Sequence, residues 1–580
     1  MNFKIEKRNK LNIGFGNVLE SLLKVRGVED VNKFLNLTDD VIEDINNYDN
    51  IEVASHILLE HLKSDSKIAI IVDNDGDGFS SAALLYNYIK RIKPSIKLEY
   101  LIHSNKAHGL TEEMMENIIS RNYNLLFIPD AGSGNIQQHK ILKEKIAMDI
   151  IVLDHHQCNR YSPYAYVVNN QMSKNVRNKS ITGVGVTYKF CKYIDNILNL
   201  NIADDFLDLL AYGMVSDSAD LRELESRYLV LEGLNRIQDG VNSNELLKKL
   251  YKSKSYSMNN KCTISGMAFY MCPAINCIIR GGDLEIKTIL FKAFIGSDEI
   301  FKDKIRGKGE VELSVEDYIL RVYTKLKKVQ DKAAEEGVEL MKNQINQFNL
   351  NNSEIIIVNG TEIENKTYNR LIVNKLCSAY NKHILLLSET GSSLSGSGTG
   401  AKNKEISDFR KWCELTGLFN YCEGHPSAFG CQIPTYNINK LYELISTIPS
   451  SDVLVYNVDE IFTEKSLNKA TVSLIGRYDY IWGNKLDEPI FAIEDIIVDS
   501  NNIKLMGKNK NTIKIIHNGI EFIKFKSSED EYNNIMKNKH NIFTIVGKFK
   551  VNEYCGNTTP QVLIEDYKYK ATEVKPKFIF

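Results

Sequence analysis

The sequence predicts an α/β protein with a parallel sheet in its first half and a separate all-β domain at its C-terminal end. From about residue 15 to 250, apolar runs of strand length alternate with helical patterns, which is typical of βαβ units. Three of these runs, residues 67–72, 125–129 and 151–153, lead directly into Asp or Asp-His residues. From about residue 451, short segments of alternating apolar and polar residues dominate, as in a small β-barrel or sandwich.

The length of 580 residues is too great for one hydrophobic core and indicates about two to four domains. We expect four parts: a parallel-sheet domain with an N-terminal lead-in (1–250), a connecting segment with a long helix (251–350), a smaller α/β domain (351–450) and a C-terminal barrel (451–580).

The overall composition excludes some kinds of site but few kinds of partner. The formal net charge of −2 leaves nucleic acid open, because a globally neutral chain can be locally basic. The ten cysteines form no CxxC pair, which argues against a zinc ribbon or a redox motif. The N-terminus lacks an apolar signal region and no apolar run reaches transmembrane length. We therefore expect a cytoplasmic protein that does not bind a membrane.

Helical patterns follow the predicted strands of the first half. One helix is predicted from Phe79, directly after the acidic loop 73–78, so its N-terminal amides would face that loop. A largely buried helix is predicted over 205–215, with Asp217 after its end. A longer helix over 312–348 has many charged residues and is expected to bridge two lobes.

The next part repeats the α/β pattern on a smaller scale, with a strand at 353–358, a helix at 368–380 and a strand at 383–388. The Gly/Ser-rich stretch 391–400 favours a flexible turn on composition alone. Beyond residue 451, segments such as 470–476 and 541–550 are predicted to be strands.

Residues 504–550 hold ten Lys against four acidic residues. This excess fits either a solvated basic face or a surface that follows a phosphate backbone. For the second interpretation, aromatic residues in and after this segment would be available to stack on bases: Phe522, Phe525, Tyr532, Phe549 and Tyr554.

The acidic residues at the predicted strand ends indicate a metal site. Asp73, Asp75 and Asp77 resemble the start of an EF-hand loop, but the twelfth position is Leu84 and the flanks are a strand and a helix. A helix cap would explain one Asp but not three at alternating positions. Carboxyl ends of parallel strands share one sheet edge, so these charges would repel one another unless a cation lay between them. Carboxylates with one or two imidazoles suit Mn²⁺ or Mg²⁺, and two such ions suit phosphoester hydrolysis by an activated water.

Four motifs in order resemble the DHH phosphoesterase superfamily: Asp73-Asn-Asp75-Gly-Asp77-Gly, Asp130-Ala-Gly, Asp154-His155-His156 and Ala211-Tyr-Gly-Met-Val-Ser-Asp217. Within it the chain is most similar to the RecJ family of single-strand-specific 5′→3′ DNA exonucleases, over nearly its whole length. The segments 395–399 and 424–430 resemble the nucleic-acid-binding DHHA1 domain, and 547–566 resembles the OB-fold of that family.

The resemblance implies roles for individual residues. The implied metal ligands are Asp75, Asp77, Asp130, His155 and Asp217, with Asp130 bridging two Mn²⁺ or Mg²⁺ ions. The implied catalytic residues are His156, which approaches the scissile phosphate, with Asp154 and with Asp73 as a ligand or a support for one. The implied substrate-binding residues are Asn276, Arg280, Ser397, Gly424 and His425. The resemblance further implies a monomer that acts on single-stranded DNA in recombination or repair, with a single-strand-binding protein or a helicase as partner.

Several positions depart from the family pattern. Thr399 stands where an Arg is usual, with Lys402 or Lys404 as substitutes; Glu423 replaces a Gly, and Ile279 stands where a Gly precedes Arg280. The segment before Gly109-Leu110 is abbreviated. These changes leave 5′-phosphate recognition and the choice between DNA and RNA open, and they fit a divergent phage or mobile-element version.

Three other functions compete with this one. The first is an oligonucleotide or cyclic-dinucleotide phosphodiesterase of the same superfamily, which would generally lack the C-terminal barrel. The second is a catalytically silent replication scaffold, which loss of metal ligands would favour, and none is lost. The third is an inorganic pyrophosphatase, which would leave the last two domains unexplained.

Overall fold

The computed structural model describes residues 1–580 except 1–2, 9–17, 105–106, 450–452, 555–556 and 573–580. The chain forms two compact units. The N-terminal unit comprises residues 26–327 and 480–487; the C-terminal unit comprises residues 1–25, 328–479 and 488–580. The four-part division expected from the sequence stays a proposal.

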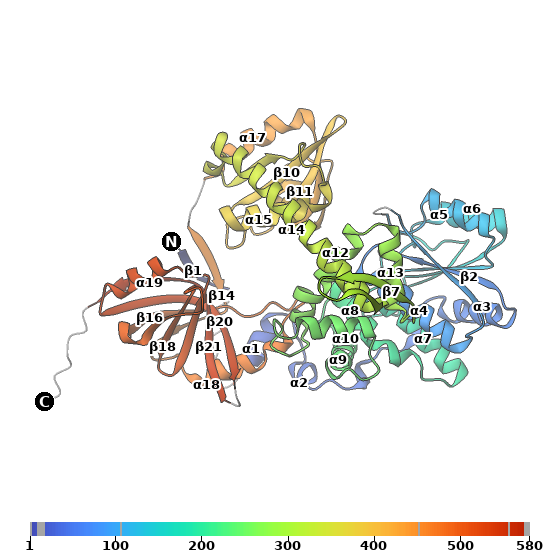
Figure 1. Ribbon diagram of the computed structural model, residues 1–580, viewed down its shortest axis with the longest axis horizontal. Coiled ribbons are helices and arrows are strands. Elements are labelled where there is room, and N and C mark those ends of the chain that lie inside the picture. The colour runs from blue at the N-terminus through green and yellow to red at the C-terminus, as the bar shows by residue number, and fades with distance from the viewer. Residues whose placement is uncertain (1–2, 9–17, 105–106, 450–452, 555–556, 573–580) are drawn as a thin grey trace. The chain divides into compact units, whose positions relative to one another are not determined.

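The N-terminal unit is built on a parallel sheet, as predicted (Figure 1). Its five strands lie in the order β3-β2-β4-β5-β6, and every neighbouring pair is parallel. Their bounds are β2 (Lys67–Val72), β3 (Lys97–Ile102), β4 (Leu125–Pro129), β5 (Asp149–Asp154) and β6 (Tyr166–Asn169). The order reverses between β2 and β4, and such a switch point is where open α/β sheets bind ligands, at the carboxyl ends of the strands.

Both faces of this sheet are covered, which is why the inner strands β2, β4 and β5 are almost continuously apolar, whereas the edge strand β3 carries Lys97 and Glu99. On one face Ile71 and Val152 pack with Ile118 of α5 and Leu142 of α6. The other face packs against helices α3, α4, α7 and α8 in a larger core, and Figure 1 shows the two helical layers. The helices of this unit are α2 (Val31–Leu35), α3 (Ile51–Lys63), α4 (Gly76–Ile92), α5 (Glu112–Arg121), α6 (Ile136–Ile146), α7 (Gly183–Leu198), α8 (Leu207–Ser216), α9 (Leu224–Asp239), α10 (Glu245–Lys254), α12 (Cys272–Gly281) and α13 (Leu284–Phe294).

The helices predicted after the acidic loop, before Asp217 and after residue 312 are confirmed as α4, α8 and α14 (Val315–Gln347). A hairpin of β7 (Ile300–Ile305) and β8 (Gly309–Ser314) precedes α14. None of the helices in the described part of the chain combines the length and the apolar character needed to span a bilayer.

The first sheet of the C-terminal unit has the order β12-β13-β11-β10-β9. It comprises β9 (Ile355–Asn359), β10 (His383–Thr390), β11 (Ser393–Thr399), β12 (Tyr421–His425) and β13 (Ala428–Pro434), and it is accompanied by α15 (Asn369–Tyr380), α16 (Phe409–Leu415) and α17 (Ile438–Ser446). The predicted flexible turn at 391–400 is wrong, because β11 is a central strand there. Its glycines are packing requirements: a Cβ on Gly396 would lie 1.8 Å from the carbonyl oxygen of Leu386, and one on Gly398 would meet the ring of Phe429.

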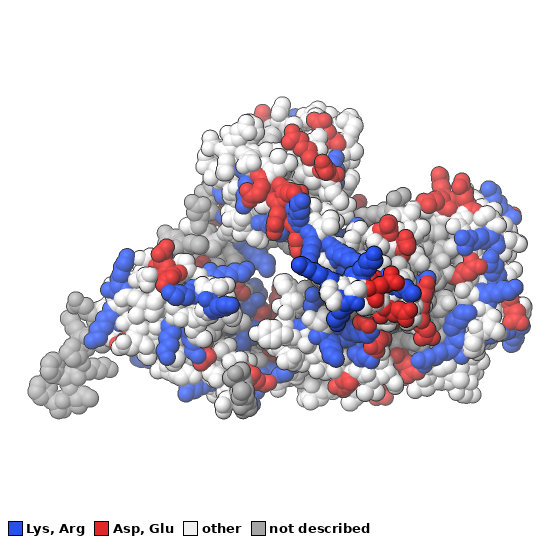
Figure 2. Space-filling view, in the orientation of Figure 1, with Lys and Arg blue, Asp and Glu red and all other residues white. Residues whose placement is uncertain are grey.

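The second sheet of the C-terminal unit is mostly antiparallel, as an OB-like barrel requires, with the order β15-β16-β20-β21-β19-β18-β17. Its strands are β15 (Glu460–Thr463), β16 (Phe491–Asp499), β17 (Ile503–Met506), β18 (Thr512–His517), β19 (Ile520–Phe525), β20 (His540–Tyr554) and β21 (Asn557–Ala571). In addition, β1 (Phe3–Lys7) pairs with β14 (Leu454–Val458), and α1 (Val18–Val25) and α19 (Glu529–Met536) complete the unit. Figure 2 shows Lys and Arg side chains spread over the visible face of this part.

Two expectations for this region are wrong. Residues 470–476 form the helix α18 (Lys469–Arg477), which Asn468 caps by accepting a hydrogen bond from the amide of Thr471. Its β-branched residues favour a strand by local preference. In the structure Val472 and Ile475 lie three positions apart on one buried face of the helix, and this packing determines the conformation. Phe522 and Phe549 are buried rather than free to stack on bases, whereas Phe525 is exposed.

Candidate metal centre and substrate-binding residues

Acidic and histidine side chains from three strand ends and one helix end meet at the carboxyl edge of the parallel sheet. They form three groups in which one ligand atom from each residue lies within 4.8 Å of the others: Asp130, His155 and His156; Asp77, His155 and Asp217; and Asp73, Asp75 and His108. All five residues expected to ligate metal are among them.

The turn after β2 presents its carboxylates because α4 starts within it. Asp75 caps this helix and accepts a hydrogen bond from the amide of Gly78 at 2.9 Å. Asp77 lies in the first turn and accepts from the amides of Gly183 and Val184, at 2.8 and 3.2 Å, at the start of α7. Burial raises the pKa of both carboxyl groups, and for Asp75 the charge of Asp73 adds to this effect.

Asp130 lies at the centre of the cluster in a strained conformation. It directly follows β4, with φ of 63°, in the left-handed region that non-glycine residues rarely adopt. Its Oδ1 atom is buried, accepts no hydrogen bond from any residue that the structure describes, and lies 3.2 Å from Nε2 of His155. Burial and the charge of Asp77 raise the pKa of Asp130 well above its usual value.

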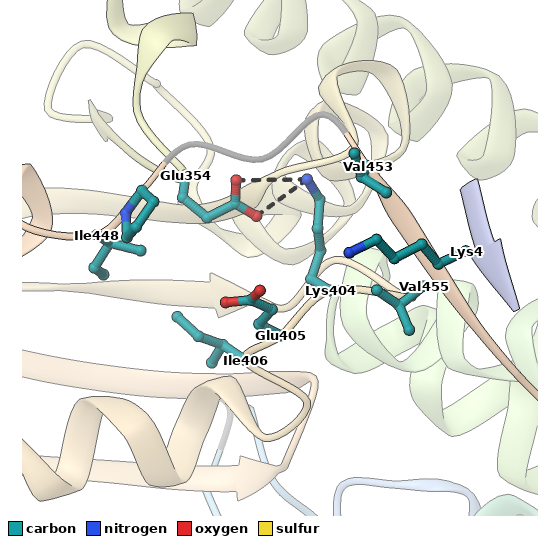
Figure 3. A pocket seen from close by; sticks show the side chains of 9 residues that line it. Lys4, Glu354, Lys404, Glu405, Ile406, Ile448, Val453 and Val455 are labelled. Atoms are coloured by element: carbon teal, nitrogen blue, oxygen red, sulfur yellow. Dashed lines mark hydrogen bonds and ion pairs between the residues drawn. The ribbon is translucent and has the colours of Figure 1, made fainter. Parts of the chain in front are cut away.

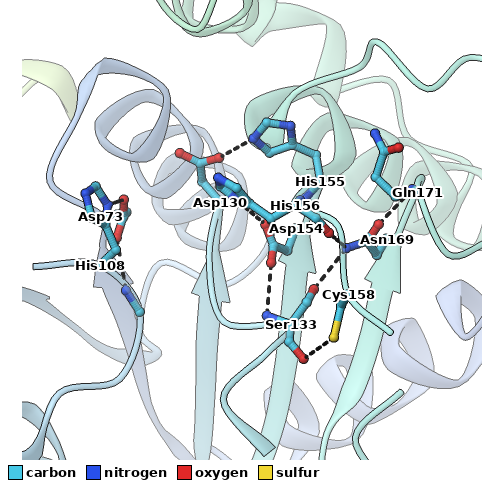
Figure 4. Close-up of polar contacts among 12 residues, drawn as sticks. Asp73, His108, Asp130, Ser133, Asp154, His155, His156, Cys158, Asn169 and Gln171 are labelled. Carbon is cyan, nitrogen blue, oxygen red and sulfur yellow. Dashed lines mark hydrogen bonds and ion pairs between the residues drawn. The ribbon is translucent and has the colours of Figure 1, made fainter. Parts of the chain in front are cut away.

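Asp154 is placed as a support rather than a ligand (Figure 4). Its carboxylate accepts hydrogen bonds from the backbone amides of Ser133, His155 and His156 and from Nδ1 of His156. Burial alone would raise the pKa of Asp154, but the bond from His156 lowers it to about 2. With its oxygens occupied, Asp154 fixes the two histidines that follow it.

The two histidines differ in their charge at pH 7. Burial lowers the pKa of His155 to about 4, so its imidazole is neutral at pH 7, the form that ligates metals. The hydrogen bond to Asp154 raises the pKa of His156 to about 9, and this side chain is largely exposed. His156 is therefore cationic at pH 7 in the absence of metal and can meet an anion.

Asp217 follows α8, and its Oδ2 atom lies 3.6 Å from Nε2 of His155. Desolvation by the surrounding protein, followed by the charge of Asp77, raises the pKa of Asp217 to about 8, although its side chain is 41% exposed. Several carboxyl groups that resist ionisation at one site signal uncompensated negative charge.

The residues present fit divalent cations. The donors are mostly carboxylate oxygens with a neutral imidazole, which suits Mn²⁺ or Mg²⁺. Among the described residues none donates a hydrogen bond to the buried Oδ1 of Asp130, and a cation would satisfy this oxygen and relieve the repulsion between the carboxylates.

His108 belongs to the cluster although it was given no role in the sequence prediction. Its Nδ1 lies 2.6 Å from Oδ2 of Asp73, whose Oδ1 accepts from the amide of Gly109 at 3.1 Å (Figure 4). The only indication of this role in the sequence is that His108 directly precedes Gly109-Leu110. It belongs to the abbreviated segment, of which residues 105–106 lie outside the described part. Asp73 thus adds its own carboxylate to the cluster and also orients His108 within it.

Asn276 and Arg280 lie in the same unit, four residues apart on α12 and therefore on one face of that helix. Arg280 is exposed and Asn276 half-buried, whereas Ile279 points into the core. The departure at Ile279 therefore serves packing and leaves the exposed face with Arg280 unchanged.

Ser397, Gly424 and His425 lie in the other unit, on neighbouring strands around β13. Gly424 has φ of 129°, and a Cβ there would lie 2.9 Å from the carbonyl oxygen of Ala428. Glu423 is exposed on the same strand.

Thr399 stands where the family has an arginine, and of the two lysines that could replace this arginine only Lys402 is free to do so. Thr399 is buried, and its hydroxyl donates to Oδ1 of Asn374 at 2.8 Å. Lys404 forms a buried ion pair with Glu354 at 3.1 Å (Figure 3), so its ammonium is engaged within the domain. Lys402 is exposed and remains the candidate.

Known proteins share both the sequence pattern and the fold. The DHH family N-terminal domain matches residues 67–214, and the RecJ OB domain matches residues 458–566. A Bacillus subtilis (strain 168) protein named as an SPbeta prophage-derived single-strand DNA-specific exonuclease, YorK, is 38% identical over 570 residues, which cover 96% of this chain and 97% of the relative. The single-stranded-DNA-specific exonuclease RecJ of the same organism is 21% identical, over 95% of this chain and 67% of its own length. The crystal structure of RecJ from Thermus thermophilus in complex with Mn²⁺ has a TM-score of 0.70 at 16% identity, covering 100% of this chain and 80% of that one.

Proposed function

Because this chain belongs to the family of RecJ-like single-strand DNA-specific exonucleases, we propose that it hydrolyses single-stranded DNA from the 5′ end to mononucleotides with two bound Mn²⁺ or Mg²⁺ ions. The observation that carries this proposal is the convergence of Asp77, Asp130, His155 and Asp217 on one sheet edge around an oxygen that no hydrogen bond satisfies. The family supports the polarity and a role in DNA recombination or repair.

Different residues of the chain would bind the cations and orient the phosphate. When bound, the two cations would activate a water molecule and offset the charge on the phosphoryl oxygens. Asp75, Asp77, Asp130, His155 and Asp217 would hold them. Asp154 keeps His156 cationic and oriented, so that His156 can donate a hydrogen bond to a phosphoryl oxygen.

The remaining candidates would hold the strand. We propose that the exposed Arg280 guanidinium and the nearby Asn276 bind phosphates beyond the reacting one, since a guanidinium fork matches phosphate geometry. Within the C-terminal unit, Ser397, Gly424 and His425 would also contact nucleic acid. The lysine-rich OB-like sheet would retain long strands through its charge.

The proposal is tested with Mn²⁺ and end-labelled single strands carrying a block at either the 5′ or the 3′ end, with duplex DNA and RNA dinucleotides in parallel. We expect mononucleotides from single strands with a free 5′ end, and no product from Asp130→Asn under the same conditions. Cleavage of dinucleotides alone would refute exonuclease action on DNA, and digestion that only a 3′ block stops would refute the polarity.

A further inference from the structure

The segment Tyr480–Asp487 lies between α18 and β16 in the sequence, yet it packs into the N-terminal unit. Ile481, Trp482 and Leu486 are buried there. Backbone oxygens of the segment accept hydrogen bonds from three side chains of this unit: Arg227 to Ile481 at 3.1 Å, Ser265 to Trp482 at 2.7 Å and Arg26 to Asp487 at 2.6 Å.

The tip of this segment is a tight turn tied to both sides of the metal ligand Asp217. The side chain of Asn484 donates to the carbonyl oxygen of Val215, and the amide of Leu221 donates to the carbonyl oxygen of Asn484, each at 3.3 Å. Gly483 and Leu486 exchange backbone hydrogen bonds of 3.0 and 3.1 Å across the turn. The turn is therefore anchored through Asn484, the residue before Lys485, to residues on both sides of Asp217.

Lys485 occupies this turn at a conformational cost. Asn484 and Lys485 have φ of 39° and 70°, the left-handed values that a two-residue turn of type I′ needs at both central positions. Asn and Gly adopt this region readily, whereas a lysine does not. A residue kept in such a conformation at a functional site is a candidate for a role of its side chain.

The Lys485 side chain is exposed, and within the described part of the chain its ammonium makes no hydrogen bond or ion pair. The nearby Asp220 is already paired with Arg222. The turn that carries Lys485 is bonded to Val215 and Leu221, which lie on either side of Asp217, and this brings the positive charge of Lys485 near the carboxylates of the cluster. An unpaired ammonium beside carboxylates that hold cations is well placed for a ligand that is itself anionic.

We propose that Lys485 is a phosphate-binding residue of the active site, whose ammonium donates to a non-bridging oxygen of the single strand. This inference rests on the proposed function, since the ligand is the substrate backbone. The segment Tyr480–Asp487 would then contribute directly to substrate binding at the sheet edge.

The test uses the full-length protein, a fluorescent single-stranded 20-mer and Ca²⁺ in place of Mn²⁺, with Kd measured by anisotropy over a range of salt concentrations. Lys485→Gly relieves the left-handed strain, so its Tm should be unchanged or higher. Its Kd should rise about 10-fold, and the slope of log K against log salt should become shallower by about 0.7, as for one lost phosphate contact. Lys485→Arg should restore both values. Lys308→Gly, the same change in the β7–β8 turn of the same unit, controls for net charge.

A Lys485→Gly protein with the wild-type Kd and salt slope would overturn the inference. So would a lowered Tm together with failure of Lys485→Arg to restore binding, because the lysine would then be structural. A wild-type protein that binds the 20-mer but cleaves no single strand in Mn²⁺ would refute the proposed function, while a weaker Lys485→Gly complex would still support this inference.

Discussion

Replacement of Gly183 by alanine tests whether the position of Asp130 controls the reaction. Gly183 is the first residue of α7, and a Cβ there would lie 2.2 Å from Oδ1 of Asp130. Cβ and the backbone Cα of Asp130 would lie at 2.5 and 2.6 Å, and ordinary contact begins near 3.4 Å. The whole of Asp130, and not its carboxylate alone, must therefore shift relative to the start of α7 by about 1 Å. A displacement of about 1 Å in a catalytic group costs roughly 100-fold in rate, or about 2.7 kcal/mol. We therefore expect kcat/KM on single-stranded DNA to fall about 100-fold.

The assay is mononucleotide release from single-stranded DNA over a Mn²⁺ titration, with Gly185→Ala as the matched control. A Cβ on Gly185 also meets a close neighbour, Cγ2 of Ile181 at 2.4 Å, but no residue of the cluster. It should therefore cost stability without a shift in the Mn²⁺ midpoint. A Gly183→Ala protein with the wild-type kcat/KM and Mn²⁺ midpoint would refute the reasoning.

Three further substitutions separate orientation, substrate binding and packing. Asp154→Asn removes the carboxylate that raises the pKa of His156, so in the metal-free protein this imidazole should titrate near about 6.5 instead of about 9, as followed by NMR; an unchanged titration would mean that Asp154 does not set its charge. Arg280→Ala should lower kcat/KM by roughly 10–100-fold, mainly through KM, with partial recovery in Arg280→Lys; wild-type kinetics would exclude the phosphate contact. Thr399→Val should lose about 1 kcal/mol of stability with the bond to Asn374 and leave the Kd for single strands unchanged; weaker binding without a change in Tm would place Thr399 in the substrate pocket.

The sheet edge could be predicted because its signal is local and repeated. An apolar run that ends on Asp130 or on Asp154-His155-His156 predicts a buried strand and a polar end together, and parallel strands bring these ends to one edge. The glycine-rich start of α7 has its explanation only in the structure, since the absent side chain of Gly183 makes room for Asp130.

Other features depend on contacts that local patterns do not encode. Gly396 signals flexibility by composition, yet it is required by the close approach of Leu386 in a neighbouring strand. His108 reaches Asp73 across 35 positions of sequence, and the turn at Lys485 reaches Asp217 across more than 200. The β-branched residues of α18 follow strand propensity, and tertiary packing overrides it.

The central proposal is that the residues around Asp130 hold two cations and that hydrolysis requires both. Equilibrium dialysis against Mn²⁺ followed by elemental analysis, on the same samples that are assayed for cleavage, tests it most directly. We expect two Mn²⁺ per chain in the wild type, and loss of both the second ion and the activity in Asp130→Asn. A wild type that cleaves single-stranded DNA in the presence of chelator with no bound metal, or an Asp130→Asn variant that retains two ions and full activity, would contradict it.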